Sequence, residues 1–350
     1  EAIAQGRASF SNLQKAGDGL PTVAERLREA GYLTAAILDG ALPGTFANLD
    51  QGFDLVVQRG VVARTPLFTL SDALHSLWGA ARSWADEKLR RDASVTTEAA
   101  TRWLSQLPAG RPLFLHVYWP HPHRPYSPPR RYLELVLAGP AHSDEAVHLY
   151  DAEIRFTDAQ VERVLRSIAR HREPDTSWIL FAADHGEELG RTAFGLGEPY
   201  YGHSIFLYDA SVHVPLIVRA PTVTPRRDPS LVSLASAAAT ILRAAGVSVP
   251  AELEPPLRLE PHAAPALPAY ASVRKAESAH YEGPVERVSL RMEGWRLVET
   301  RKPFHQLELL QQGAEGERPA EPSEHPELVR DLLARLHARY AADADDVEKL

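Results

Sequence analysis

Apolar positions along the chain recur with two spacings, and these predict alternating strands and helices. Over residues 144–171 they recur every three or four positions, as on one face of a helix. Short apolar runs predict strands at 33–38, 112–119, 177–182 and 214–220. Further helices are expected at 20–30, around 70–89, at 94–107 and at 231–245. This order is typical of an α/β fold in which helices sandwich a mostly parallel sheet.

The first predicted helix carries signals at both ends. Thr22 and Glu25 have the spacing of a capping box, and Gly31 follows the last turn. Apart from the helix at 70–89, the segment 40–92 is expected to be irregular.

The last part of the chain has a different character. We expect a large α/β domain over 1–247, a linker rich in Pro and Ala over 248–268, and a small α+β subdomain over 269–350. That subdomain is predicted to contain short antiparallel strands at 270–273, 287–291, 295–300 and 306–310. A terminal helix is predicted at 326–340.

Composition excludes several classes of function. The chain has 350 residues, a net charge of −8 and no cysteine, so it contains no disulfide, thiolate zinc site or cysteine nucleophile. Basic residues form no stripe, which argues against a nucleic-acid partner. Apolar runs are too short to span a bilayer. Since the chain starts at Glu1 and its only methionine is Met292, we expect a longer protein, whose other part could carry a targeting or membrane segment.

Candidate chemistry lies where predicted strands end. Asp184 and His185 follow one apolar run, His121 and His123 follow another, and His203 precedes a third. In an open parallel sheet, the loops after the strand ends meet in one crevice. A carboxylate and an imidazole can bind a divalent cation, and nearby histidines can contact ester oxygens or protonate a leaving group.

Each of these features also has a simpler interpretation. An acid followed by histidine after a strand is commonly a turn or a cap, and histidines in a proline-rich loop are commonly solvated. Their joint occurrence at strand ends favours a site that binds and cleaves an anionic ester.

The motifs, taken in order, resemble those of the sulfatase family in the alkaline-phosphatase-like superfamily. The segment Ala-Asp-His-Gly-Glu-Glu-Leu-Gly at 183–190 is similar to the family's metal-binding segment. Two further loop segments are similar to family motifs: Pro-His-Arg-Pro-Tyr at 122–126, and Gly-His with the following Leu-Tyr-Asp and Val-Pro-Leu-Ile-Val at 202–218. The segment that begins with Leu-Pro-Thr at 20–32 resembles the helix after the family's nucleophile region. Residues 292–297 resemble part of its C-terminal subdomain.

The resemblance implies a role for each matching residue. Asp184 and His185 would ligate one divalent metal ion, which in the family is commonly Ca²⁺; Mn²⁺ and Zn²⁺ stay open because imidazole is a poor ligand for Ca²⁺. His123 would contact the ester oxygens, and His203 would protonate the leaving group. His121 has no counterpart in the family pattern. Small-molecule or glycan sulfate or phosphate esters are the implied substrates, and a periplasmic or membrane-anchored location is implied as well.

Departures from the family pattern leave three functions open. The family's nucleophile and first metal acids lie upstream of the Leu-Pro-Thr helix, so we expect them upstream of this chain. Ser204 and Ala210 replace a usual glycine and a usual acid. The protein is therefore expected to be a sulfate ester hydrolase, a phosphoryl-transferring relative (a phosphonate or phosphodiester hydrolase or a phosphoethanolamine-type transferase), or a non-catalytic homologue. Its oligomeric state is open.

Overall fold

The computed structural model describes residues 21–39, 50–58, 61–64, 92–108, 110–140, 144–192, 199–203, 205–221, 223–260, 267–275, 283–314 and 316–347. The chain forms two compact units. The first comprises Glu1–Ser177 and Ile241–Val249, and the second comprises Trp178–Thr240 and Pro250–Leu350.

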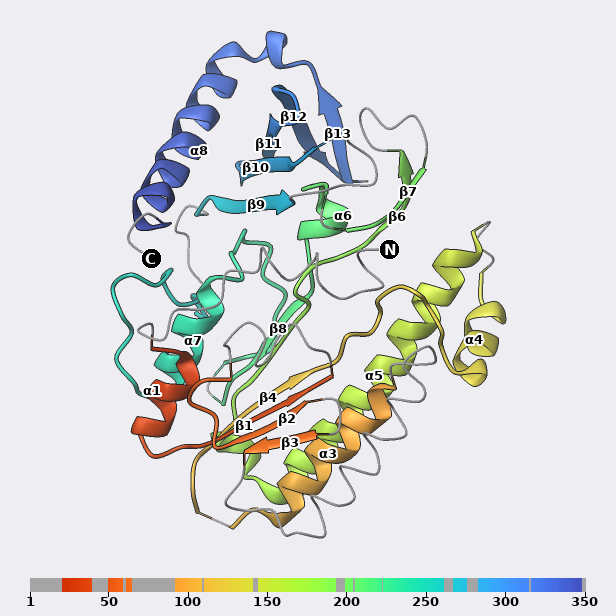
Figure 1. The fold of residues 1–350 in the computed structure, drawn as a ribbon, viewed down its shortest axis with the longest axis vertical. Helices are drawn as coiled ribbons and strands as arrows, with labels where there is room; N and C mark the ends of the chain where they lie inside the picture. Colours follow the sequence, from red (N-terminus) through yellow and green to blue (C-terminus); the bar gives the residue numbers. More distant parts are fainter. Residues whose placement is uncertain are drawn as a thin grey trace. The chain divides into compact units, whose positions relative to one another are not determined.

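The first unit contains a four-stranded sheet in the order β3-β2-β1-β4 (Figure 1). Within it, β1 pairs in parallel with β2 and β4, and β3 is antiparallel to β2. Every residue of β1 is buried, as a central strand covered on both faces requires. The strands are β1 (Leu33–Leu38), β2 (Leu55–Gln58), β3 (Val61–Arg64) and β4 (Leu113–Tyr118).

Three of the described helices of the first unit begin at side-chain caps. The predicted capping box is present: Thr22 Oγ1 accepts a hydrogen bond from Glu25 N–H, and the Glu25 carboxylate accepts one from Thr22 N–H. Asp144 caps the long helix by accepting from Ala146 N–H. The helices are α1 (Val23–Glu29), α3 (Ala93–Gln106), α4 (Arg130–Leu137) and α5 (Glu145–His171), followed by the 3₁₀ helix η2 (Pro174–Thr176).

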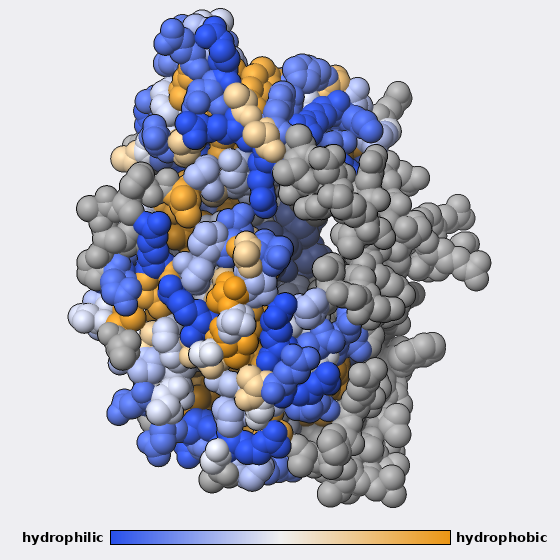
Figure 2. Space-filling model, turned by 90° about the vertical axis from the view of Figure 1, so that its left-hand side faces the viewer, coloured by the Kyte–Doolittle hydropathy of each residue, from blue (hydrophilic) through white to orange (hydrophobic). Residues whose placement is uncertain are grey.

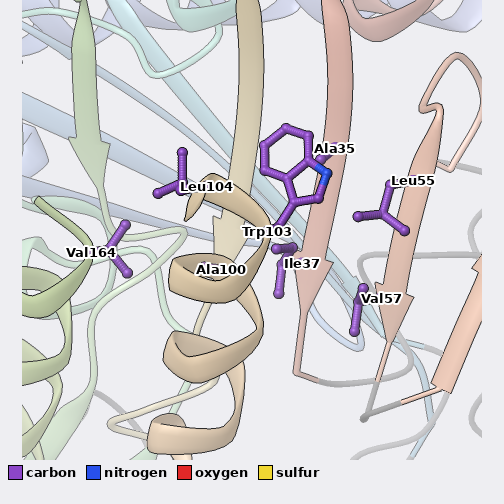
Figure 3. Packing of buried hydrophobic residues seen from close by; sticks show 8 residues of the cluster. All are labelled: Ala35, Ile37, Leu55, Val57, Ala100, Trp103, Leu104 and Val164. Atoms are coloured by element: carbon purple, nitrogen blue, oxygen red, sulfur yellow. The ribbon is translucent and has the colours of Figure 1, made fainter. Parts of the chain in front are cut away.

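Alternating residues of the sheet contribute to two apolar cores, so helices cover both of its faces. On one face α3 and α5 pack against the strands (Figure 3), through Ala35, Ile37, Leu55, Val57, Ala100, Trp103, Leu104 and Val164. On the other face α1 contributes to the cluster of Ala24, Ala36, Leu38, Phe53 and Val56. The predicted helix-covered, largely parallel sheet is thereby confirmed.

The second unit contains two short antiparallel pairs and a five-stranded antiparallel sheet in the order β13-β12-β11-β10-β9. The pairs are β5 (Ile179–Ala182) with β8 (Leu216–Arg219) and β6 (Glu188–Thr192) with β7 (Pro199–Gly202), and α6 (Asp209–Val212) follows β7. The sheet consists of β9 (Ala269–Lys275), β10 (Val285–Met292), β11 (Trp295–Lys302), β12 (Gln306–Gly313) and β13 (Gly316–Ala320).

Both faces of this five-stranded sheet are covered from within the second unit. After the 3₁₀ helix η3 (Pro322–Glu324), α8 (Pro326–Val347) packs on one face through Val329, Leu332 and Leu336. The segment after β7 packs on the other face, where buried residues form the cluster of Tyr200, Ile205, Phe206, Tyr208, Val285, Val298 and Leu310. The predicted C-terminal sheet therefore supports the segment that carries His203.

Most predicted elements appear close to their expected limits, including α7 (Ser236–Ala244) in place of 231–245. Two predictions were wrong. Residues 55–58 and 61–64 form β2 and β3 where irregular structure was expected. Strand β5 pairs antiparallel with β8 and belongs to no parallel sheet in the described residues. The helix predicted at 70–89 lies outside the described residues, and the linker at 248–268 stays a prediction.

Figure 2 shows how hydrophobic and hydrophilic residues are distributed over one face of the molecule. On the face seen in Figure 2, hydrophobic residues occupy small areas separated by hydrophilic ones. Among the helices described, none is both long and apolar enough to cross a bilayer.

Candidate functional site

The Asp184–His185 pair lies directly after β5, in a turn fixed by Gly186. Gly186 N–H donates to the Ser211 carbonyl across 2.8 Å, which joins the turn to α6. A Cβ at Gly186 would lie only 2.0 Å from the Ala210 carbonyl oxygen. The glycine is thus required by this close approach of two backbone segments.

Replacing Gly186 with alanine is expected to destabilise the fold by about 2–3 kcal/mol, because the turn and α6 must move apart. Chemical denaturation would measure the loss. Gly139→Ala is the matched control, since a Cβ there meets its nearest backbone oxygen at 3.2 Å. Equal effects of the two substitutions would contradict the proposed fit of the turn.

The donor atoms of Asp184 and His185 lie together. His185 Nδ1 is 2.9 Å from the Gly186 carbonyl, so Nδ1 carries the proton and Nε2 carries the lone pair. That Nε2 lies 3.8 Å from Asp184 Oδ1, which also accepts the His185 backbone N–H at 3.0 Å. Histidines that ligate metals commonly donate their other ring N–H to a carbonyl in this way. The pair fits two ligands of one cation.

His203 lies beside this pair and contacts a carboxylate that sequence reasoning missed. Its ring stacks on the His185 ring, with centroids 3.9 Å apart and planes at 27°. Its Nδ1 lies 3.0 Å from Oε2 of Glu187, whose side chain is 2% exposed. The run of two acids after Asp-His-Gly was the available signal for Glu187.

The backbone around His203 is held by the core of the second unit. Tyr200 OH, from the buried cluster over the C-terminal sheet, donates to the His203 carbonyl at 2.8 Å. Further along, the buried Arg287 guanidinium donates to the Ile205 carbonyl at 3.0 Å and lies 4.5 Å from the Phe206 ring centroid. These contacts fix the chain on both sides of the imidazole.

An ion-pair network joins α6 to the C-terminal sheet. Asp209 Oδ1 accepts from Arg291 at 2.8 Å and from Arg296 at 2.5 Å, and Asp209 N–H donates to Glu317 Oε2. Nearby, Tyr208 OH donates to Glu308, and burial raises the pKa of the Glu308 carboxyl. Since α6 abuts the Gly186 turn, this network supports the Asp184–His185 pair indirectly.

His123 belongs to the first unit, in the loop between β4 and α4. The buried Glu153 of α5 contacts both sides of that loop: Oε1 accepts Ser127 N–H at 2.7 Å, and Oε2 lies 3.7 Å from His121 Nε2. His123 Nδ1 donates to the Arg124 carbonyl across 2.7 Å, so Nε2 is the ring nitrogen that this bond does not use. His121 is therefore a buried supporting residue, and Glu153 is a second residue that sequence reasoning missed.

Glu153→Ala is expected to destabilise the protein by about 2 kcal/mol, because it leaves Ser127 N–H and the buried His121 ring without their carboxylate partner. Thermal unfolding would show this. The control is Glu162→Ala on the same helix, where the side chain is 59% exposed and pairs with Arg166. That change should cost under about 0.5 kcal/mol. A Glu153 effect as small as the control would mean that the carboxylate does not hold the loop.

Three of the four predicted site residues, Asp184, His185 and His203, lie together in the second unit. Convergence of His123 with them stays a prediction, because His123 belongs to the other unit. Within the described ranges, no group of three or more His, Asp or Glu residues could hold a metal ion. Asp184 and His185 would thus need further ligands, and the metal stays a prediction.

Comparison with known proteins identifies the family. The family model described as Sulfatase matches residues 4–247, so this chain belongs to the sulfatase family. It is 24% identical over 292 residues to the choline-sulfatase of Rhizobium meliloti (strain 1021), an alignment that covers 69% of this chain and 55% of that protein. The chain spans about half the length of the curated relatives it matches.

Solved structures confirm the alkaline-phosphatase-like fold. The putative sulfatase yidJ from Bacteroides fragilis superposes with a TM-score of 0.69 at 18% identity, over 93% of this chain and 77% of that one. A protein solved in complex with its substrate D-glucosamine-2-N,6-O-disulfate gives a TM-score of 0.68 at 15% identity, over 97% and 86%.

Proposed function

We propose that the protein is a metal-dependent hydrolase of sulfate esters. The observation that carries this proposal is the Asp184–His185 pair, whose carboxylate and Nε2 are presented together in a chain of the sulfatase family. The nucleophile is expected upstream of the helix at 20–32, as the family resemblance implies. We also propose a periplasmic or membrane-anchored location, which cell fractionation would test.

The side chains present divide the work between them. A bound divalent cation would neutralise charge on the ester oxygens. Asp184 and His185 would hold that cation, and His123 would donate a hydrogen bond to a nonbridging oxygen. His203 would give a proton to the leaving oxygen as the ester bond breaks. Ca²⁺ is proposed on family grounds, with Mn²⁺ or Zn²⁺ as the alternatives that the His185 imidazole favours.

Sulfate esters of small molecules or glycans are the proposed substrates. One relative is a choline-sulfatase, and one structural neighbour was solved with a disulfated glucosamine. Phosphoryl transfer is the second candidate. The His185 imidazole is a poor ligand for Ca²⁺ and a better one for Mn²⁺ or Zn²⁺, which slightly favours a phosphoryl-transferring relative.

Turnover of 4-nitrophenyl sulfate and of bis(4-nitrophenyl) phosphate by the full-length protein tests the proposal. We expect the sulfate ester to be hydrolysed faster than the phosphodiester. A chelator should abolish the sulfatase activity, and added divalent metal should restore it. Faster phosphodiester cleavage would support the second candidate. No hydrolysis of either ester by metal-loaded protein would identify a non-catalytic homologue.

A further inference from the structure

Glu187 is a buried carboxylate that the proposed mechanism does not use. Its side chain is 2% exposed, and one oxygen is 3.0 Å from His203 Nδ1. Its other oxygen, Oε1, is buried and has no hydrogen-bond partner among the described residues. Burying a carboxylate is costly unless a charged or hydrogen-bonded partner compensates it. The His203 imidazole is therefore the partner that compensates the buried Glu187 carboxylate.

Strand register explains how the two side chains meet. Strands β6 and β7 pair antiparallel, with Glu188 opposite Gly202. In an antiparallel ladder, the next position outward brings the residue before Glu188 opposite the residue after Gly202. These two residues are Glu187 and His203. The contact is thus set by a hydrogen-bonded hairpin, and the ring is further fixed by its stacking on His185.

This arrangement assigns a role to Nδ1 of His203. An ionised carboxylate only accepts hydrogen bonds, so His203 Nδ1 must donate to Glu187. Nε2 is then the ring nitrogen that would face the ester. The same arrangement, in which a carboxylate fixes the tautomer and orientation of a working histidine, recurs in hydrolases of unrelated fold.

We propose that Glu187 is a positioning residue for His203, which it holds with Nε2–H directed to the leaving oxygen of the ester. This inference rests on the proposed function. When the bond between sulfur and the bridging oxygen breaks, its electron pair stays on the bridging oxygen, which takes the proton from Nε2. The sulfuryl group passes to the nucleophile, and His203 is left neutral with its Nδ1–H still bonded to Glu187.

Dependence on the leaving group separates this role from a merely structural one. Departure of a poor leaving group needs protonation, whereas 4-nitrophenolate departs without it. Glu187→Gln in the full-length protein is expected to lower turnover of phenyl sulfate about 10- to 100-fold, the usual cost of losing such a supporting partner. Turnover of 4-nitrophenyl sulfate should change less than about 3-fold. A structural defect would lower both rates by the same factor.

A matched control and a double variant complete the test. Glu188 is 1% exposed and accepts a hydrogen bond from Ser211 at 2.9 Å, so Glu188→Gln changes an adjacent buried carboxylate. It should affect the two esters equally. His203→Ala should show the leaving-group effect in full, and adding Glu187→Gln to it should cost nothing more. Equal losses for both esters in Glu187→Gln, or additive losses in the double variant, would overturn the proposal.

A measurement on the wild-type protein tests the hydrogen bond itself. Long-range ¹H–¹⁵N spectra of the wild-type imidazole should show the His203 proton on Nδ1, with the resonance assigned by its loss in His203→Ala. An unprotonated Nδ1 would refute the role of Glu187. If wild-type protein hydrolyses neither sulfate ester while this tautomer is observed, the proposed function fails and the positioning role fails with it.

Discussion

Asp184→Ala is expected to remove the bound metal from the full-length protein and to lower sulfate ester turnover about 1000-fold. The reason is the geometry of the pair: the Asp184 carboxylate lies 3.8 Å from His185 Nε2, and the substitution leaves a single neutral donor. Metal stabilisation of developing charge is worth several kcal/mol, and each 1.4 kcal/mol corresponds to a factor of ten.

Metal analysis and steady-state kinetics on the same preparation would check this result. Asp184→Asn is the near-isosteric variant, which keeps one oxygen and should retain part of the metal. Asp175→Ala removes an exposed acid of η2 and should leave both quantities unchanged. If Asp184→Ala bound metal and turned over substrate like the wild type, the assignment of this site would be wrong.

Local signals made part of the fold predictable. The capping box of Thr22 and Glu25, the all-buried β1 and the amphipathic α5 each follow from neighbours along the chain. The pairing of β5 with β8 does not, because it joins segments more than 30 residues apart and a short apolar run fits a parallel or an antiparallel partner equally well.

The same reasoning separates the predicted and missed residues of the site. Asp184, His185 and His203 stand out because their chemistry is written in short motifs. Glu187 meets His203 through the register of β6 and β7, and Glu153 meets the His123 loop through α5. Each of these carboxylates supports another candidate residue. Tertiary contacts, and not sequence spacing, decide which residue each one supports.

His123→Ala is expected to lower turnover about 100-fold while metal content and stability stay at their wild-type values. Its imidazole hydrogen-bonds locally to the Arg124 carbonyl, and Glu153 holds the loop through Ser127 and His121 instead. Removing the His123 ring should therefore leave the loop in place. A single donor to an oxyanion is commonly worth 100- to 1000-fold in turnover.

The neighbouring histidine provides the contrast. His121 is 5% exposed and packs edge-on against the Phe156 ring, so His121→Ala should lower the unfolding temperature together with turnover. His123→Ala should lower turnover alone. Turnover, metal content and thermal unfolding, measured for both variants, would therefore separate the substrate contact from its support. Loss of bound metal in His123→Ala would make His123 a ligand, and the assignment of the ester oxygens to it would have to be abandoned.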